Sequence, residues 1–77
     1  MDKIKEIAEI AARIRGLREL MDITPAEMAE KTDVSLDEYE KLESGESDFS
    51  FTFIYKCAER FGVDKVDILK GTSPKLS

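Results

Sequence analysis

Two helix starts of the same kind stand eleven residues apart within residues 24–45, TPAEMAEKTDVSLDEYEKLESG, and they limit what the chain can fold into. Thr24 and Glu27 form a T-x-x-E pattern. In this pattern the Thr hydroxyl accepts from a backbone N–H inside the helix, and the Glu carboxylate accepts from the N–H of the cap. Pro25 falls at the first helical position, where a missing N–H costs nothing. Ser35 begins the same pattern again as S-x-x-E, so the stretch predicts two short helices in succession.

The segment between the two helix starts has room for one short helix and a tight turn. A helix of about seven residues must end there and the next must begin at a steep angle, as in a helix-turn-helix unit. Asp33 falls where the chain needs a left-handed residue, a conformation that Asp and Asn tolerate better than other side chains. The small side chain of Ala29 lets two helices cross closely. The apolar positions that would pack this unit are Met28, Ala29, Val34, Tyr39 and Leu42.

Apolar residues at helical spacing predict three more helices, so we expect an all-α domain of five helices. The predicted flanking helices are residues 3–21, residues 51–61 between the cap Ser50 and the terminator Gly62, and residues 64–70, to which Val66, Ile68 and Leu69 contribute apolar side chains. Asp2 is a candidate cap for the first helix, and Gly45 a left-handed terminator for the second motif helix. Residues 71–77 have linker composition, so the domain is expected to span residues 1–70.

The first helix carries more apolar surface than one face needs. Its main stripe is Ile4, Ile7, Ala11, Ile14, Leu17 and Met21. Ile10 and Leu20 lie beside this stripe and widen it. We weigh ordinary core packing against a dimer contact or a docking surface for a missing domain.

Four of the six aromatic residues lie within residues 49–55. Phe51 shares the apolar stripe of the fourth helix and is expected to fill the core. Phe53 and Tyr55 lie off that stripe. For these two we weigh core packing against self-association or partner contact, because aromatic anchors are favoured at interfaces. A homodimer through the Phe53/Tyr55 surface is therefore one expectation.

Length and composition exclude several classes of protein. A chain of 77 residues is one domain, near the lower limit for a core that folds without disulfides or metals. With one Cys and no His, neither an intrachain disulfide nor a Cys/His zinc site can form. Cys57 is expected in the core rather than as a nucleophile, and a reducing, cytoplasmic setting is expected. No apolar run approaches the length of a membrane span, so we expect no membrane association. We also expect no cofactor.

The charge is unevenly distributed. The net charge is −5, whereas a domain that attracts nucleic acid without specificity is normally basic. Residues 1–23 carry five basic and five acidic side chains, residues 24–48 two basic and nine acidic, and residues 49–77 five basic and three acidic. The acidic charge is therefore concentrated on the predicted helix-turn-helix.

The run A-E-M-A-E-K-T-D-V-S followed by L-E-S-G resembles the helix-turn-helix of lambda-repressor-like DNA-binding domains, of the Cro/repressor type or xenobiotic-response-element family. The usual form is A-x-L-A-x-x-x-G-V-S, an apolar residue, and an apolar-Glu-x-Gly ending. The resemblance covers about residues 10–70. It implies a five-helix lambda-repressor-like bundle that binds double-stranded DNA in a bacterial or phage-type transcription regulator. The run from Phe49 to Ser77 also looks like the region that leads into a C-terminal cupin sensor domain.

The resemblance implies a set of DNA contacts. In that family the second motif helix, about residues 35–43 here, enters the major groove and the first crosses the phosphate backbone. The implied DNA-binding residues are Thr24, Pro25, Ser35, Leu36, Asp37, Lys41, Ser44 and Ser47, with Glu38 and Glu40 nearby. Lys41 would donate to guanine or to phosphate, Leu36 would meet a thymine methyl group, and Asp37 would accept from the cytosine amino group. Where the family usually offers Gln, Arg, Ser or Asn, this chain offers mostly carboxylates.

One further pair is implied by the resemblance and is structural. Arg18 and Glu43 match a family pair that forms a partly buried salt bridge between the first helix and the second motif helix. Glu43 is therefore expected to hold the fold together rather than to read bases.

Two other classes of function are weighed. The same fold with an acidic second helix would serve as a protein-interaction module for a basic partner. A basic rim from Lys31, Lys41, Lys56 and Arg60 would favour DNA, and an unbroken acidic face would favour protein. Catalysis by paired carboxylates such as Asp37 and Glu40 is not expected, because the chain has little room for a substrate cavity.

Overall fold

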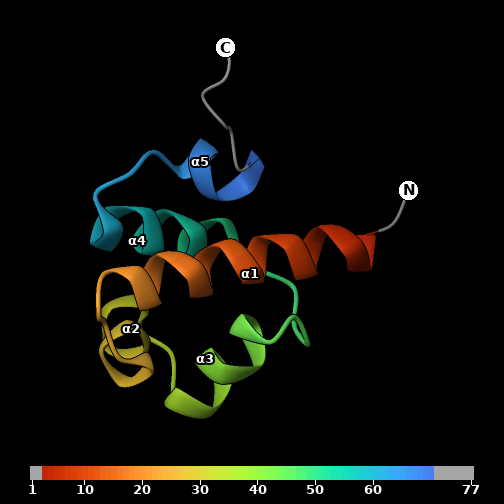
Figure 1. The fold of residues 1–77 in the computed structure, drawn as a ribbon. Coiled ribbons are helices and arrows are strands. Elements are labelled where there is room, and N and C mark those ends of the chain that lie inside the picture. Colours follow the sequence, from red (N-terminus) through yellow and green to blue (C-terminus); the bar gives the residue numbers. More distant parts are fainter. Residues whose placement is uncertain (1–2, 71–77) are drawn as a thin grey trace.

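The computed structural model describes residues 3–70, which form a bundle of five α-helices without strands (Figure 1). The helices are α1 (Lys3–Leu20), α2 (Pro25–Thr32), α3 (Leu36–Glu43), α4 (Phe51–Phe61) and α5 (Lys65–Lys70). α1 and α4 cross the middle of the molecule, with α2 and α3 on one side and α5 on the other (Figure 1). The all-α prediction is confirmed. The predicted tail of residues 71–77 and the candidate cap Asp2 lie outside the described residues.

Three helices begin at the side-chain caps that the sequence predicts. Thr24 Oγ1 accepts from the backbone N–H of Glu27 at 3.1 Å, and the Thr24 N–H donates to Glu27 Oε1 at 2.9 Å, which completes the capping box. The hydroxyls of Ser35 and Ser50 each accept from the N–H three residues later, at 3.1 and 3.0 Å. These bonds satisfy donors that a helix start leaves without an intrahelical partner.

Four helices are followed, one or two residues after their last residue, by a residue in the left-handed conformation. The φ angles are 60° at Asp22, 65° at Asp33, 86° at Gly45 and 74° at Gly62. After α2, the N–H of Val34 donates to the Ala29 carbonyl at 3.1 Å, so the reversal satisfies a helix-end acceptor. The left-handed positions predicted for Asp33 and Gly45 are confirmed. The one at Asp22 was not predicted, and it places the end of α1 at Leu20 rather than at residue 21.

The core is built by all five helices and the α1–α2 connection. Its members are Ala11, Ile14, Ile23, Met28, Ala29, Tyr39, Leu42, Phe53, Ile54, Cys57, Ala58, Phe61 and Ile68. The motif positions Met28, Ala29, Tyr39 and Leu42 are buried as predicted, and Val34 is half-buried. Cys57 is fully buried, and burial raises the pKa of its thiol to about 12. This confirms Cys57 as a core residue.

Among the aromatic residues of α4, the prediction for Phe51 is wrong, and the alternative left open for Phe53 is decided in favour of core packing. Phe53 is only 4% exposed, with its ring stacked on Phe49 at 5.6 Å and tilted against Tyr39 at 6.0 Å between centroids. There is accordingly no Phe53/Tyr55 surface, and of the two only Tyr55 is exposed. Phe51 is 65% exposed rather than in the core. It is the first residue of α4, at the edge of the face that Phe53 helps to bury.

The apolar faces of α1 and α5 are narrower than predicted. Met21 is 42% and Leu20 81% exposed, and the chain returns to the core at Ile23, which is 4% exposed. In α5 only Ile68 is buried, while Val66 and Leu69 are 41% and 37% exposed. A helix of six residues has less than two turns, so only one of its side chains, Ile68, reaches the core. Ile10 is half-buried against the core, and the side chain of Ile4 lies outside the description.

Candidate nucleic-acid interface

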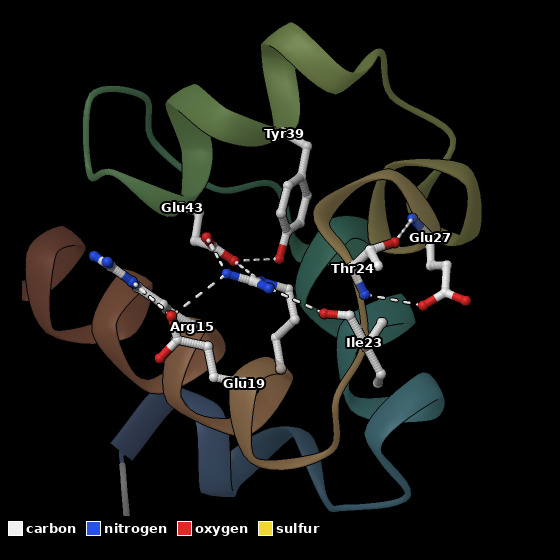
Figure 2. A network of polar contacts seen from close by, with 8 residues as sticks. Arg15, Glu19, Ile23, Thr24, Glu27, Tyr39 and Glu43 are labelled. Carbon is white, nitrogen blue, oxygen red and sulfur yellow. Dashed lines mark hydrogen bonds and ion pairs between the residues drawn. The ribbon is translucent and has the colours of Figure 1, made fainter.

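α3 is anchored to α1 by a two-pronged ion pair. Arg18 Nε donates to Glu43 Oε2 at 2.7 Å, and Arg18 Nη2 donates to Glu43 Oε1 at 3.1 Å (Figure 2). The two side chains are 11% and 12% exposed. This is the pair that the resemblance implies. The hydrogen bond to Glu43 raises the pKa of Arg18, so the guanidinium stays charged at neutral pH.

Two more hydrogen bonds extend this anchor. Tyr39 Oη donates to Glu43 Oε2 at 2.6 Å, and Arg18 Nη1 donates to the Ile23 carbonyl at 3.0 Å (Figure 2). Burial, helped by the bond to Glu43, raises the pKa of the Tyr39 phenol, so the phenol remains a donor. The network thus joins α1, the chain entering α2, and α3. Sequence analysis missed the role of Tyr39, although its spacing of four from Glu43 on one helix would have allowed it.

The anchor divides α3 into two sides, which we call inner and outer. The inner side is Tyr39, Leu42 and Glu43, which face the core or the anchor. The outer side is Leu36, Asp37, Glu38, Glu40 and Lys41, all exposed. Leu36 is 45% exposed, and the side chains of Asp37 and Lys41 are 84% and 52% exposed. Four of the eight implied DNA-contact positions lie along α3 or at its N-cap, and the structure leaves all four open to solvent.

The groups at the starts of α2 and α3 that could donate to a phosphate are partly used in capping the helices. The hydroxyls of Thr24 and Ser35 are exposed, but each already accepts from a backbone N–H as a cap. Each hydroxyl keeps its own hydrogen, which can still be donated to a phosphate oxygen. Pro25 has no N–H, so the start of α2 is the poorer of the two anion sites.

The two serines after α3 are less available. Ser44 Oγ lies 3.0 Å from the Lys41 carbonyl and 3.1 Å from Glu46 Oε2, and its single hydrogen serves these acceptors. Ser47 is half-buried. A phosphate contact at Ser44 would therefore compete with a neighbouring carboxylate.

The lysines around the motif are engaged in ion pairs. Lys31 Nζ lies 2.9 Å from Glu59 Oε1, and Lys56 Nζ lies 3.2 Å from Asp33 Oδ2. Lys41 Nζ lies 3.9 Å from Asp37 Oδ2. Arg60 is exposed. Three of the four cations expected to form a basic rim are therefore already close to a carboxylate.

A comparison with protein families supports the helix-turn-helix fold. The sequence model of a helix-turn-helix family, of the Cro/repressor type, matches residues 14–68. The match covers well over half of the chain, and it runs from the second half of α1 into α5. The comparison with curated proteins finds no match. In residues 3–70 there is no helix long and apolar enough to cross a membrane. With its five-helix, lambda-repressor-like bundle, this chain belongs to the Cro/repressor-type helix-turn-helix family of DNA-binding domains.

Proposed function

We propose that this domain recognises specific sequences in double-stranded DNA as the DNA-binding part of a cytoplasmic transcription regulator, with α3 in the major groove. One observation carries the proposal. The inner side of α3 is held by Arg18 and the core, while the outer side is free to meet a ligand. A helix that is held in this way can present the same side chains to every DNA site.

The proposed contacts divide into positioning and reading. The hydroxyls of Thr24 and Ser35, with the backbone N–H groups beside them, would donate to phosphates and set the register. Lys41 would donate to guanine or phosphate, Leu36 would touch a thymine methyl group, and Asp37 would accept from a cytosine amino group. Pro25, Ser44 and Ser47 would lie along the phosphate backbone.

A single copy is expected to bind weakly. Few cations are free to replace condensed counterions, and the outer side of α3 carries three carboxylates. Two linked copies would double the contacts and raise the effective concentration of the second. We therefore propose a homodimer, joined by a C-terminal domain that follows residues 1–70 and the linker 71–77. A cupin sensor is the proposed candidate for that domain.

The test is a selection of bound fragments from sheared genomic DNA, followed by anisotropy titration at about 50 and 200 mM salt. Lys41→Ala is expected to weaken binding and to reduce its salt dependence. Lys70→Ala is the matched control, because it removes the same charge from α5, on the side of the molecule away from α3 (Figure 1). Equal effects of the two variants would contradict the placement of α3 in the groove.

One observation favours a second candidate function, a protein-interaction module. Residues 24–48 carry nine acidic and two basic side chains, and Lys31 is paired with Glu59. A basic protein surface would meet this face without the repulsion that phosphates experience. This function would be preferred if neither the domain nor a dimerised version enriched any DNA fragment, while a lysine-rich peptide bound and was weakened by Asp37→Asn.

A further inference from the structure

The centre of the outer side of α3 is occupied by one pair of opposite charges. Asp37 and Lys41 are four residues apart, so they lie on the same face of the helix. Tyr39 and Leu42, which are buried, lie on the opposite face. The Lys41 ammonium is 3.9 Å from the Asp37 carboxylate, and both side chains are more than half exposed. The first groups that a groove would meet are therefore one acceptor and one donor, side by side.

The pairing changes what each group can do. Asp37 alone would be repelled by phosphates, and Lys41 alone would bind any phosphate without regard to sequence. Together they carry no net charge, and the Lys41 ammonium lies beside the Asp37 carboxylate. Such a couple fits a surface on which a hydrogen-bond donor stands beside an acceptor.

The major-groove edge of a C·G base pair is such a surface. Cytosine presents its N4 amino group as a donor, and guanine presents O6 and N7 as acceptors next to it. Carboxylates select the cytosine amino group, and lysine selects guanine O6 and N7. An A·T pair also offers a donor and acceptors, but it satisfies neither preference. With α3 in the groove as proposed above, we propose that Asp37 and Lys41 together read one C·G base pair and are the main specificity determinants of this domain.

The test uses selection from randomised duplexes with the wild type and two variants. Asp37→Asn replaces the acceptor by an amide, which offers both an acceptor and a donor and matches adenine N6 and N7. Glu30→Gln on α2 is the matched control, since it removes the same charge from an exposed position that is not on α3. The Asp37 side chain is 84% exposed, so the variant is expected to fold, and a thermal melt checks this.

The expected result is a wild-type site in which one C·G pair recurs. Replacing that pair by A·T should weaken the wild type by about tenfold or more. Asp37→Asn should lose the preference for C·G and select A·T at the same position. Glu30→Gln should bind somewhat more tightly overall and select the same sequence as the wild type.

Two results would overturn the inference, and they have different meanings. If Asp37→Asn selected the same base as the wild type, Asp37 would not read bases, although DNA binding by α3 would stand. If the wild type enriched no sequence, in single or dimerised form, the proposed function would fail together with the inference.

Discussion

The inner and outer sides of α3 differ in how firmly their side chains are held. On the inner side, Glu43 accepts three hydrogen bonds from Arg18 and Tyr39, and Leu42 is buried. On the outer side, Asp37 has one long contact with Lys41. The eight residues of α3 therefore divide into a side that stabilises the fold and a side that is open to a ligand. Changes on the inner side should act on stability, and changes on the outer side should act on binding alone.

The largest effect is expected from Glu43→Ala. The variant leaves the guanidinium of Arg18 buried without its partner, which should lower the free energy of unfolding by roughly 3 kcal/mol or more. The melting temperature should fall by more than about 10 °C. Glu40→Ala, an exposed neighbour on the same helix, is the control and should have little effect. An unchanged melting temperature in Glu43→Ala would remove the distinction between the two sides.

A second effect should appear at high pH. Burial raises the pKa of Cys57 to about 12, so the folded chain keeps a proton that the unfolded chain releases above pH 8.5 or so. The contribution of the neutral Cys57 thiol to stability is fully present below the pKa of the thiol in the unfolded chain. It is lost as the pH rises from that value through the pKa of the thiol in the folded chain. Between pH 8 and pH 10 the loss should be on the order of 1–2 kcal/mol. Burial raises the pKa of Tyr39 as well, so this phenol acts in the same direction.

Urea unfolding at the two pH values measures this loss. Cys57→Ala should be less stable than the wild type at pH 8 but should lose less stability on going to pH 10. Parallel pH dependence in the two proteins would show that the thiol plays no part.

Tyr39→Phe should have a smaller effect. It removes the hydrogen bond to Glu43 but leaves both Arg18 bonds, so the expected cost is about 1.5 kcal/mol. In a double-mutant cycle with Glu43→Ala the two costs should not add, because both changes act on one carboxylate. Additive costs would mean that the bond from Tyr39 does not strengthen the anchor.

The smallest effect on stability is expected from Lys41→Ala. The ion pair with Asp37 is long and exposed, so the free energy of unfolding should change by less than about 0.5 kcal/mol. DNA binding should nevertheless weaken. A loss of stability as large as that of Tyr39→Phe would show that the outer side also supports the fold.

Local features of the fold could be predicted from sequence, and long-range ones only in part. The caps at Thr24 and Ser35 depend on hydrogen bonds within one helical turn, so a pattern of four residues contains them. The burial of Phe53 depends on the ring of Tyr39, which belongs to another helix. The position of Phe53 on the buried face could have been predicted, because Phe53, Cys57 and Phe61 are four residues apart along α4. Phe51, at the start of the helix, is exposed although its spacing is also compatible with that face.

In the candidate site, too, local features could be predicted from sequence and long-range contacts could not. The exposure of Asp37 and Lys41 follows from the helical spacing of Tyr39 and Leu42, which the sequence shows. The pairs of Lys31 with Glu59 and Lys56 with Asp33 join α4 to α2 and to the turn that follows it. Their formation depends on how these segments cross, so a count of charges along the chain could not reveal that the rim is largely neutralised.

The last helix, α5, is hydrogen-bonded to a side chain of the first helix, α1. Arg13 in α1 donates to the carbonyls of Ile68 and Leu69 at 3.0 Å each, and so satisfies acceptors at the end of α5. A helix of six residues is too short to persist by itself. During synthesis, α1 leaves the ribosome before α5, so Arg13 is already present when the carbonyls of Ile68 and Leu69 emerge. We therefore expect α5 to form on the surface of α1, as the last part of the domain to fold.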